Sequence, residues 1–224
     1  TFWLGFLLGA YVLLMVGLGL YAGSRVKNEE DYLVAGRRLP LWLAWGTLLA
    51  TWFGAATVLG SSEAARAEGV RGTVLDPFAS GLALIVAGLF FARRVWEMKL
   101  LTVGDLFAQK YGRKTELVSS VVQALGYLPW IAAQYLALAA IMGHFFSIDR
   151  TTAILGAALF VTFLTMIGGM WSVTLTDTAQ ICVVLVSLVL LGVKFASVMG
   201  NGSVADGIET TWQQTPADLR TLLP

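Results

Sequence analysis

A run of small and polar residues interrupts an apolar segment that is long enough to cross a membrane. It extends from Ala50 to Ser62 and reads ATWFGAATVLGSS. Glycine costs about 1 kcal/mol relative to alanine inside a helix, and threonine costs somewhat less, so this run weakens the helix. In lipid, a carbonyl released from a helix is tolerated only where it faces protein or a water-filled cavity. Because released carbonyls coordinate Na⁺ in the broken helices of transporters, we interpret the run as a candidate ion or solute site.

A carboxylate stands at the start of another apolar segment, where Asp76 precedes Pro77. One interpretation is structural, with Asp76 as the N-cap of a helix and Pro77 at its first position. The other is functional, with Asp76 at the outer mouth of a solute cavity and Ser80 one turn further along. A carboxylate there would suit an amine or a hydroxyl on the solute and would disfavour a bare anion. The sequence leaves both interpretations open.

Two more polar side chains lie inside apolar segments. Asp177 follows Thr176 near the start of the last segment, and an ionisable residue at membrane depth is a functional hypothesis by default. The alternative is that its charge is favourable beside a helix N-terminus. Gln134 lies midway along the segment 115–146, where we expect it to face the interior of a helix bundle. Whether it contacts a solute or another helix is left open.

The composition identifies an integral membrane protein. Of the 224 residues, 57% are hydrophobic and 13% are charged, whereas soluble domains have about 25% charged residues. The net charge of +1 argues against nucleic acid as a partner. The single cysteine, Cys182, excludes an internal disulfide. The sequence has no Cys/His cluster, no phosphate-binding loop and no HExxH motif, so we do not expect an enzyme.

Several apolar segments are near or above the roughly 20 residues that a helix needs to cross a membrane. They are the ranges 2–22, 41–62, 76–95, 115–146, 152–170 and 173–199. The first has no basic residue ahead of it and is too long for the apolar core of a signal peptide, so we predict a true span. The fourth is long enough that we expect it to tilt, or to bend at Pro129. Gly168 and Gly169 predict a tight turn between the last two.

Lysine and arginine predict how the spans are oriented. Most of the 15 basic residues lie in the loops 23–40 and 93–114, and the positive-inside rule places these loops in the cytoplasm. The segment 201–224 is then an extracytoplasmic loop. Because the chain begins at Thr1 rather than Met and ends at Pro224 in a polar segment, we expect it to be truncated from a longer protein.

Two sequence motifs carry a resemblance to a known family. The first is DYLVAGRRLP, over 31–40, which precedes the interrupted segment; the second is GGMWSVTLTDTAQ, over 168–180, which joins the last two spans. Together they resemble the sodium:solute symporter family, whose members include sodium-coupled sugar, proline, pantothenate, iodide and sialic acid carriers. The resemblance covers nearly the whole chain, and it is strong for the family and weak for the substrate.

The resemblance implies the fold of the bacterial leucine transporter, which contains two inverted five-helix repeats. The chain would then be an all-α integral membrane protein with one leading helix over 1–22 and a cytoplasmic loop over 23–40. The first five-helix repeat would follow over 41–199, beginning with the broken helix 41–62. The second, C-terminal repeat would be missing from this chain.

The resemblance also assigns site residues. It implies that the backbone carbonyls of Ala50 and Phe53 bind Na⁺, and it associates Asp177 with sodium release or a second sodium site. Positions that meet the substrate in related carriers are occupied by Trp52, Gly54 and Thr57, with Asp76 and Gln134 as further substrate-binding candidates. The structural alternatives are that the small residues allow close helix packing and that the Thr57 hydroxyl bonds back to the Phe53 carbonyl.

Two functions fit this pattern. The first is a Na⁺-coupled symporter of a small organic solute, such as an amino acid, a sugar or a carboxylate, in the plasma (inner) membrane. Na⁺ would be the coupling ion, and the lipid bilayer and the missing repeat would be its other partners. The alternative is a symporter-like membrane sensor module of a histidine kinase. The sequence does not identify the solute.

Overall fold

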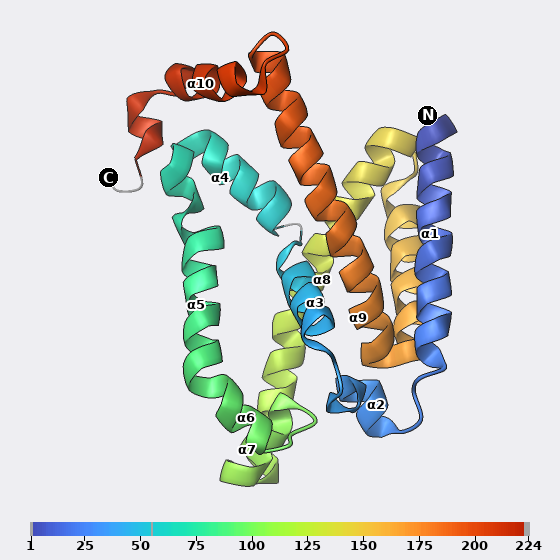
Figure 1. The fold of residues 1–224 in the computed structure, drawn as a ribbon. Coiled ribbons are helices and arrows are strands. Elements are labelled where there is room, and N and C mark those ends of the chain that lie inside the picture. Colours follow the sequence, from blue (N-terminus) through green and yellow to red (C-terminus); the bar gives the residue numbers. More distant parts are fainter. Residues whose placement is uncertain (1, 55, 222–224) are drawn as a thin grey trace. The chain divides into compact units, whose positions relative to one another are not determined.

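A computed structural model describes residues 2–54 and 56–221, and this part of the chain consists of helices without a strand (Figure 1). Contacts between residues divide the chain into two units. The first unit comprises Thr1–Leu48 and Phe90–Asp177, and the second comprises Leu49–Leu89 and Thr178–Pro224. Two long helices, α3 (Leu41–Trp52) and α9 (Arg150–Met199), contribute to both units.

The described residues include four helical stretches that are long and apolar enough to cross a membrane. They are Gly5–Gly23, Thr57–Glu97, Arg113–Phe146 and Arg150–Met199. The predicted class, an all-α membrane protein, is therefore confirmed. The predicted spans 152–170 and 173–199 belong to one helical stretch, α9. Pro129 lies inside α8 (Arg113–Phe146) and does not interrupt it.

The first unit contains several short helices between its long ones. Its elements are α1 (Phe2–Gly23), α2 (Glu29–Val34), the 3-10 helix η1 (Ala35–Arg37), the start of α3, α6 (Arg93–Glu97), α7 (Val103–Tyr111), α8 and the first part of α9. The predicted loop 23–40 thus includes α2 and η1. Asn28 begins α2, because its side chain accepts a hydrogen bond from the Asp31 N–H at 2.8 Å.

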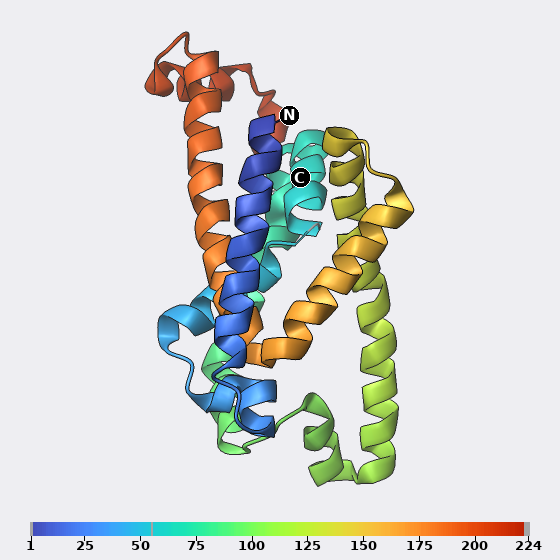
Figure 2. The same cartoon turned by 90° about the vertical axis from the view of Figure 1, so that its right-hand side faces the viewer.

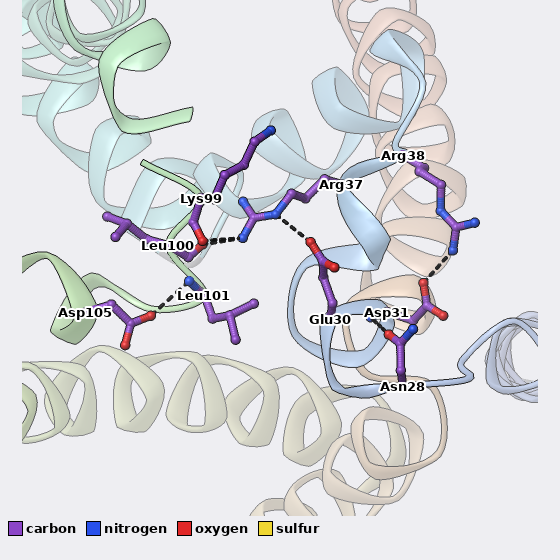
Figure 3. A network of polar contacts seen from close by, with 9 residues as sticks. All are labelled: Asn28, Glu30, Asp31, Arg37, Arg38, Lys99, Leu100, Leu101 and Asp105. Atoms are coloured by element: carbon purple, nitrogen blue, oxygen red, sulfur yellow. Dashed lines mark hydrogen bonds and ion pairs between the residues drawn. The ribbon is translucent and has the colours of Figure 1, made fainter. Parts of the chain in front are cut away.

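Arg37 connects this segment to the chain between α6 and α7 (Figure 3). Its guanidinium donates to the carbonyl oxygens of Lys99 and Leu100, each at 2.9 Å. It also donates to the Glu30 carboxylate at 2.6 Å. The two segments that the charge pattern places in the cytoplasm are therefore joined by one arginine, whose planar group can serve several acceptors at once.

A capping box begins α7. The Thr102 side chain accepts from the Asp105 N–H at 3.3 Å, and the Asp105 carboxylate accepts from the Thr102 N–H at 2.7 Å. The Leu101 N–H also donates to Asp105, at 2.9 Å. Hydrogen bonds from the Thr102 and Leu101 backbone favour the ionised carboxylate and lower the pKa of Asp105 below its ordinary value.

Glycines in α1 allow the first part of α9 to approach closely. A Cβ at Gly19 would lie 2.8 Å from Leu164 Cδ2, and one at Gly23 would lie 2.7 Å from Ile167 Cγ2. Figures 1 and 2 both show the C-terminal end of α1 beside the turn in α9. A buried apolar cluster lies in this unit and consists of Ala22, Ala35, Leu43 and Trp171.

The turn inside α9 lies at Gly169, within the predicted Gly168-Gly169 turn. Its backbone has φ 49° and ψ −138°, a conformation that L side chains rarely adopt. A Cβ at this position would also collide with the Tyr32 backbone oxygen and would lie 2.7 Å from the Tyr32 ring. Glycine is therefore required here both by the backbone conformation and by the close approach of the segment at Tyr32.

The second unit contains the remaining elements. They are the end of α3, the π-type helix η2 (Ala56–Gly60), α4 (Ser61–Glu68), η3 (Gly69–Thr73), η4 (Val74–Ala79), α5 (Ser80–Ala87), the second part of α9, α10 (Val204–Gln214) and η6 (Ala217–Arg220). Another π-type helix, η5 (Gly88–Ala92), runs from this unit into the first.

The segment 201–224, which is predicted to be an extracytoplasmic loop, contains the helix α10. Ser203 is the N-cap of α10, and its hydroxyl accepts from the Asp206 N–H at 3.2 Å. Gly207 allows α10 to pack closely on α9, since a Cβ at Gly207 would meet the Ala196 backbone. The polar composition of this segment did not indicate a helix, and α10 contacts α9 closely through Gly207. Residues 222–224 lie outside the described part of the chain.

We expect Gly169→Ala to destabilise the protein by about 2 kcal/mol or more, because alanine is strained in this conformation and its methyl group would meet the Tyr32 backbone. Thermal unfolding of the purified protein in detergent measures the effect. Gly156→Ala in the same helix is the matched control, since the space around Gly156 is open and alanine favours a helix. A Gly169→Ala protein as stable as the wild type would contradict the assigned turn.

Candidate functional site

The interrupted segment contains a break in the helix, which we call the helix break and define as Phe53 and Gly54. Helix α3 ends at Trp52, and a π-type helix begins at Ala56. The Phe53 N–H still donates to a carbonyl in α3, but the Gly54 N–H donates to the Trp52 oxygen at 2.9 Å. Ala55 lies outside the described residues. The chain therefore leaves the α-helix at the position that the small residues predict.

The helix break changes the hydrogen bonding of the Ala50 carbonyl. In a continuous α-helix, the Gly54 N–H would donate to the carbonyl oxygen of Ala50, four residues earlier. Here that N–H turns to Trp52 instead. The Ala50 oxygen thereby loses its ordinary helical donor, which is the chemical requirement for a carbonyl that is to coordinate a cation. The side chain of Ala50 has no part in this chemistry.

Several hydroxyl groups surround Asp76 and form what we call the Asp76 cluster. The Thr57 hydroxyl lies 2.9 Å from Asp76 Oδ2 and 2.7 Å from the Trp52 carbonyl oxygen, so it can donate to either acceptor. Ser61 donates to the same Oδ2 at 3.2 Å, and Ser80 donates to Oδ1 at 2.8 Å. The Trp52 side chain also hydrogen-bonds the carboxylate.

The Asp76 cluster joins three of the predicted substrate-binding residues, namely Trp52, Thr57 and Asp76. Gly54 lies in the adjoining helix break. Ser80, one turn after Asp76, joins the cluster through its hydroxyl. The alternative in which Thr57 bonds back to the Phe53 carbonyl is wrong, because the backbone acceptor is the Trp52 carbonyl, five residues earlier. Thr57 lies in a π-type helix, in which hydrogen bonds join residues five apart rather than four, so its acceptor lies one residue earlier than in an α-helix.

The backbone at Asp76 explains how its side chain reaches the preceding arm of the chain. Asp76 is extended, with φ −140° and ψ 118°, and the peptide bond to Pro77 is cis. Pro77 has no N–H to donate, so the helix starts anew after Asp76. The non-helical backbone fits the predicted N-cap position. In the described part of the chain, the hydrogen bonds to its carboxylate come from side chains and not from a backbone N–H, so the N-cap role stays a prediction.

The Asp76 cluster is electrostatically negative. An ionised carboxylate only accepts hydrogen bonds and has about four lone-pair positions, whereas each neighbouring hydroxyl supplies one proton. Within the described residues, no lysine or arginine forms an ion pair with Asp76. Asp76 is also half-buried rather than enclosed. The cluster can therefore accept further hydrogen bonds and would attract a group that carries positive charge.

Asp177 lies in the first unit and receives a hydrogen bond from Thr47. The Thr47 hydroxyl donates to Asp177 Oδ2 at 2.5 Å. Asp177 follows the turn at Gly169 by about two helical turns. Because the dipole effect is confined to the first turn, the interpretation of Asp177 as a charge at a helix start is wrong. Its side chain instead faces a hydroxyl on α3.

Sequence reasoning missed two of the residues in these contacts, Thr47 and Ser61. Thr47 lies one turn before Ala50 in α3, so a polar residue on the helix face that precedes the break was an available signal. Ser61 belongs to the interrupted segment but had no assigned role. Gln134 is half-buried in α8 of the first unit, and its role in substrate binding stays a prediction.

Glu63 directly follows the interrupted segment and lies in α4. In α4, Arg66 donates to Glu63 at 2.6 Å, and both side chains are exposed. This pair connects neighbouring turns of one helix. Solvent screens an exposed pair of this kind, so it adds little to stability.

Comparison with known proteins gives a consistent result. The profile of the sodium:solute symporter family matches residues 32–221. The human protein named high affinity choline transporter 1 is 31% identical over 204 residues, which are 88% of this chain and 35% of that protein.

Two bacterial proteins are also similar. The sodium/glucose cotransporter of Vibrio parahaemolyticus is 27% identical over 180 residues, which are 76% of this chain and 32% of that protein. The sodium/pantothenate symporter of Haemophilus influenzae is 29% identical over 188 residues, which are 81% of this chain and 39% of that protein. The chain thus spans about a third of the length of these relatives.

We expect Thr57→Val to lower the free energy of unfolding by about 1 kcal/mol, because valine keeps the shape of threonine but removes a hydrogen bond to Asp76 or to the Trp52 carbonyl. Thr57→Ser is the matched control, since serine keeps the hydroxyl. Unfolding of the purified protein in detergent, followed by tryptophan fluorescence, measures the difference. Equal stability of the valine and serine variants would show that the Thr57 hydroxyl does not hold the cluster together.

Proposed function

Because this chain belongs to the sodium:solute symporter family, we propose that it supplies part of the sodium site and of the solute site of a Na⁺-coupled symporter. The solute is a small organic molecule. The relatives described above are named as transporters, which supports this function over an enzyme and gives no support to the sensor module of a histidine kinase. The protein acts in the plasma (inner) membrane.

The observation that carries this proposal is the helix break. The Gly54 N–H donates to Trp52, and the Ala50 oxygen is thereby freed from its helical donor. Na⁺ is a hard cation and prefers such oxygen ligands, by the reasoning that holds for other hard cations. We assign the carbonyls of Ala50 and Phe53 to the sodium site. The remaining ligands come from a second repeat of the same protein, which packs against this one in the leucine-transporter-like fold.

We assign Asp177 to sodium release. A carboxylate at membrane depth is expensive unless it serves an ion pathway or has a partner. The Thr47 hydroxyl satisfies one of its oxygens, which leaves the other oxygen for a passing cation. Thr47 therefore acts as a positioning residue that holds the carboxylate in one orientation.

The Asp76 cluster supports a solute that carries an ammonium group or several hydroxyl groups. Asp76 supplies negative charge and acceptor oxygens, Thr57 and Ser80 supply hydroxyls, and the Trp52 ring can contact a cation. Choline and glucose, which appear in the names of two relatives, have these groups. A solute whose only charge is a carboxylate would be repelled by Asp76. The bulk of Trp52 favours a small molecule.

Uptake by the full-length protein in proteoliposomes tests the proposed function. We expect radiolabelled choline or glucose to accumulate when an inward Na⁺ gradient is imposed, because sodium entry drives the solute inward. Replacement of Na⁺ by K⁺ should abolish accumulation. Labelled pantothenate tests whether a carboxylate is excluded. Uptake that proceeds equally with either cation would contradict sodium coupling, whichever solute is carried.

We expect Asp177→Asn to raise the Na⁺ concentration for half-maximal uptake or to slow turnover, because the variant keeps the shape and the Thr47 contact but loses the charge. Uptake measured over a range of Na⁺ concentrations tests this. Asp149→Asn is the matched control: Asp149 accepts from the Thr151 N–H at the start of α9, and asparagine is an equally good N-cap. Unchanged sodium dependence of Asp177→Asn at normal expression would assign Asp177 a purely structural role.

A further inference from the structure

A cavity of about 480 Å³, which we call the Arg25 cavity, lies in the first unit close to the end of α1. None of its lining residues belongs to the proposed sodium and solute sites. It is lined by Ser24, Arg25, Lys27, Arg38 and Trp171. Three of these side chains are cationic, and no acidic side chain lines the cavity.

One of the three cations is already paired. Arg38 donates to Asp31 at 2.6 Å, and the Asp31 side chain is buried while that of Arg38 is largely exposed (Figure 3). The Asp31 carboxylate also accepts from the Lys27 backbone N–H at 3.2 Å. Within the described residues, neither Arg25 nor Lys27 forms an ion pair. Asp31 therefore neutralises Arg38, and Arg25 and Lys27 give the cavity a positive excess.

Arg25 is held in place by aromatic rings. Its guanidinium carbon lies 5.1 Å from the centre of the Tyr21 ring and 5.5 Å from the centre of the Trp171 ring. It also donates to the Tyr21 hydroxyl at 2.5 Å. Ring contacts use the face of the guanidinium and leave N–H groups at its edge for an anion. The positive group is thus positioned before any ligand arrives.

Trp171 forms one wall of the cavity. It is only 7% exposed, and its ring lies beside Arg25. Its indole nitrogen is buried away from the cavity space, so a ligand there would meet the ring and not the N–H.

We propose that the Arg25 cavity binds the phosphate group of an anionic phospholipid. The phosphate oxygens accept from Arg25 and Lys27. The cavity begins where the apolar stretch Gly5–Gly23 ends, which is the depth of lipid headgroups. Basic pockets at this depth on the cytoplasmic side suit anionic headgroups, and the charge pattern predicts that this end faces the cytoplasm.

The apolar surface of α1 favours a lipid over a soluble phosphate. Leu13, Leu14 and Leu20 of α1 are more than half exposed, at 73%, 53% and 53%. Acyl chains can lie along such a helix while the headgroup occupies the cavity at its end. A free phosphate would gain the ionic contacts only. This inference rests on the first unit alone and is independent of the sodium and solute assignments.

Native mass spectrometry of the full-length protein in detergent tests the proposal. Delipidated protein is titrated with phosphatidylglycerol, phosphatidylcholine or glycerol phosphate. We expect phosphatidylglycerol to bind more tightly than the other two. Arg25→Gln and Lys27→Gln should each weaken its binding about fivefold, the effect of one cation near an anionic headgroup.

Lys114→Gln and Arg94→Gln are the matched controls, because both residues are exposed, lie on the side predicted to be cytoplasmic and do not line the cavity. We expect them to leave phosphatidylglycerol binding unchanged. An equal loss in the controls would show that the lipid is attracted by the general positive charge of the surface and would contradict a specific site. If phosphatidylcholine binds as tightly as phosphatidylglycerol, the cavity does not select an anionic headgroup. If glycerol phosphate binds as tightly, the acyl chains contribute nothing and the ligand is not a lipid. If Arg25→Gln unfolds the protein, Lys27→Gln, whose side chain lies outside the ring contacts, decides the outcome.

Discussion

The absence of water from the hydrocarbon core is the constraint on which this structure depends. Every backbone group there needs a partner within the protein, so a helix can be broken only where other polar groups take over. At the helix break the Gly54 N–H turns to Trp52, and the Thr57 hydroxyl lies within reach of the same carbonyl. The oxygen left over, that of Ala50, is the one that the proposed sodium site uses. The helix break therefore both weakens the helix and leaves a carbonyl oxygen for the proposed ion.

The same rule governs the two intramembrane acids. Asp76 is surrounded by the hydroxyls of Thr57, Ser61 and Ser80, and Asp177 receives one from Thr47. Hydroxyl groups satisfy a carboxylate without cancelling its charge, whereas an arginine would do both. Neither acid is paired with a lysine or an arginine in the described part of the chain. The arginine ion pairs of the described residues lie elsewhere. Arg66 pairs with Glu63 in α4, and Arg37 and Arg38 hold the short helices of a segment predicted to face the cytoplasm.

The sequence predicted features that have a local cause. Small residues predicted the break near Gly54, paired glycines predicted the turn at Gly169, and Asp76 before Pro77 predicted a non-helical start. It did not predict contacts between residues far apart, such as Thr47 with Asp177, 130 positions away, because nothing in either local pattern specifies the other. The helix α10 was missed because its polar composition resembles a loop.

The contact between α1 and the turn of α9 has a consequence for the order of folding. Gly19 and Gly23 pack against Leu164 and Ile167, which are synthesised much later. At a synthesis rate of about 5–20 residues per second, the interval is on the order of ten seconds. During that time α1 lacks the neighbours against which its glycines fit, and only lipid surrounds this face. Helix α1 is thus synthesised well before it can acquire its final packing.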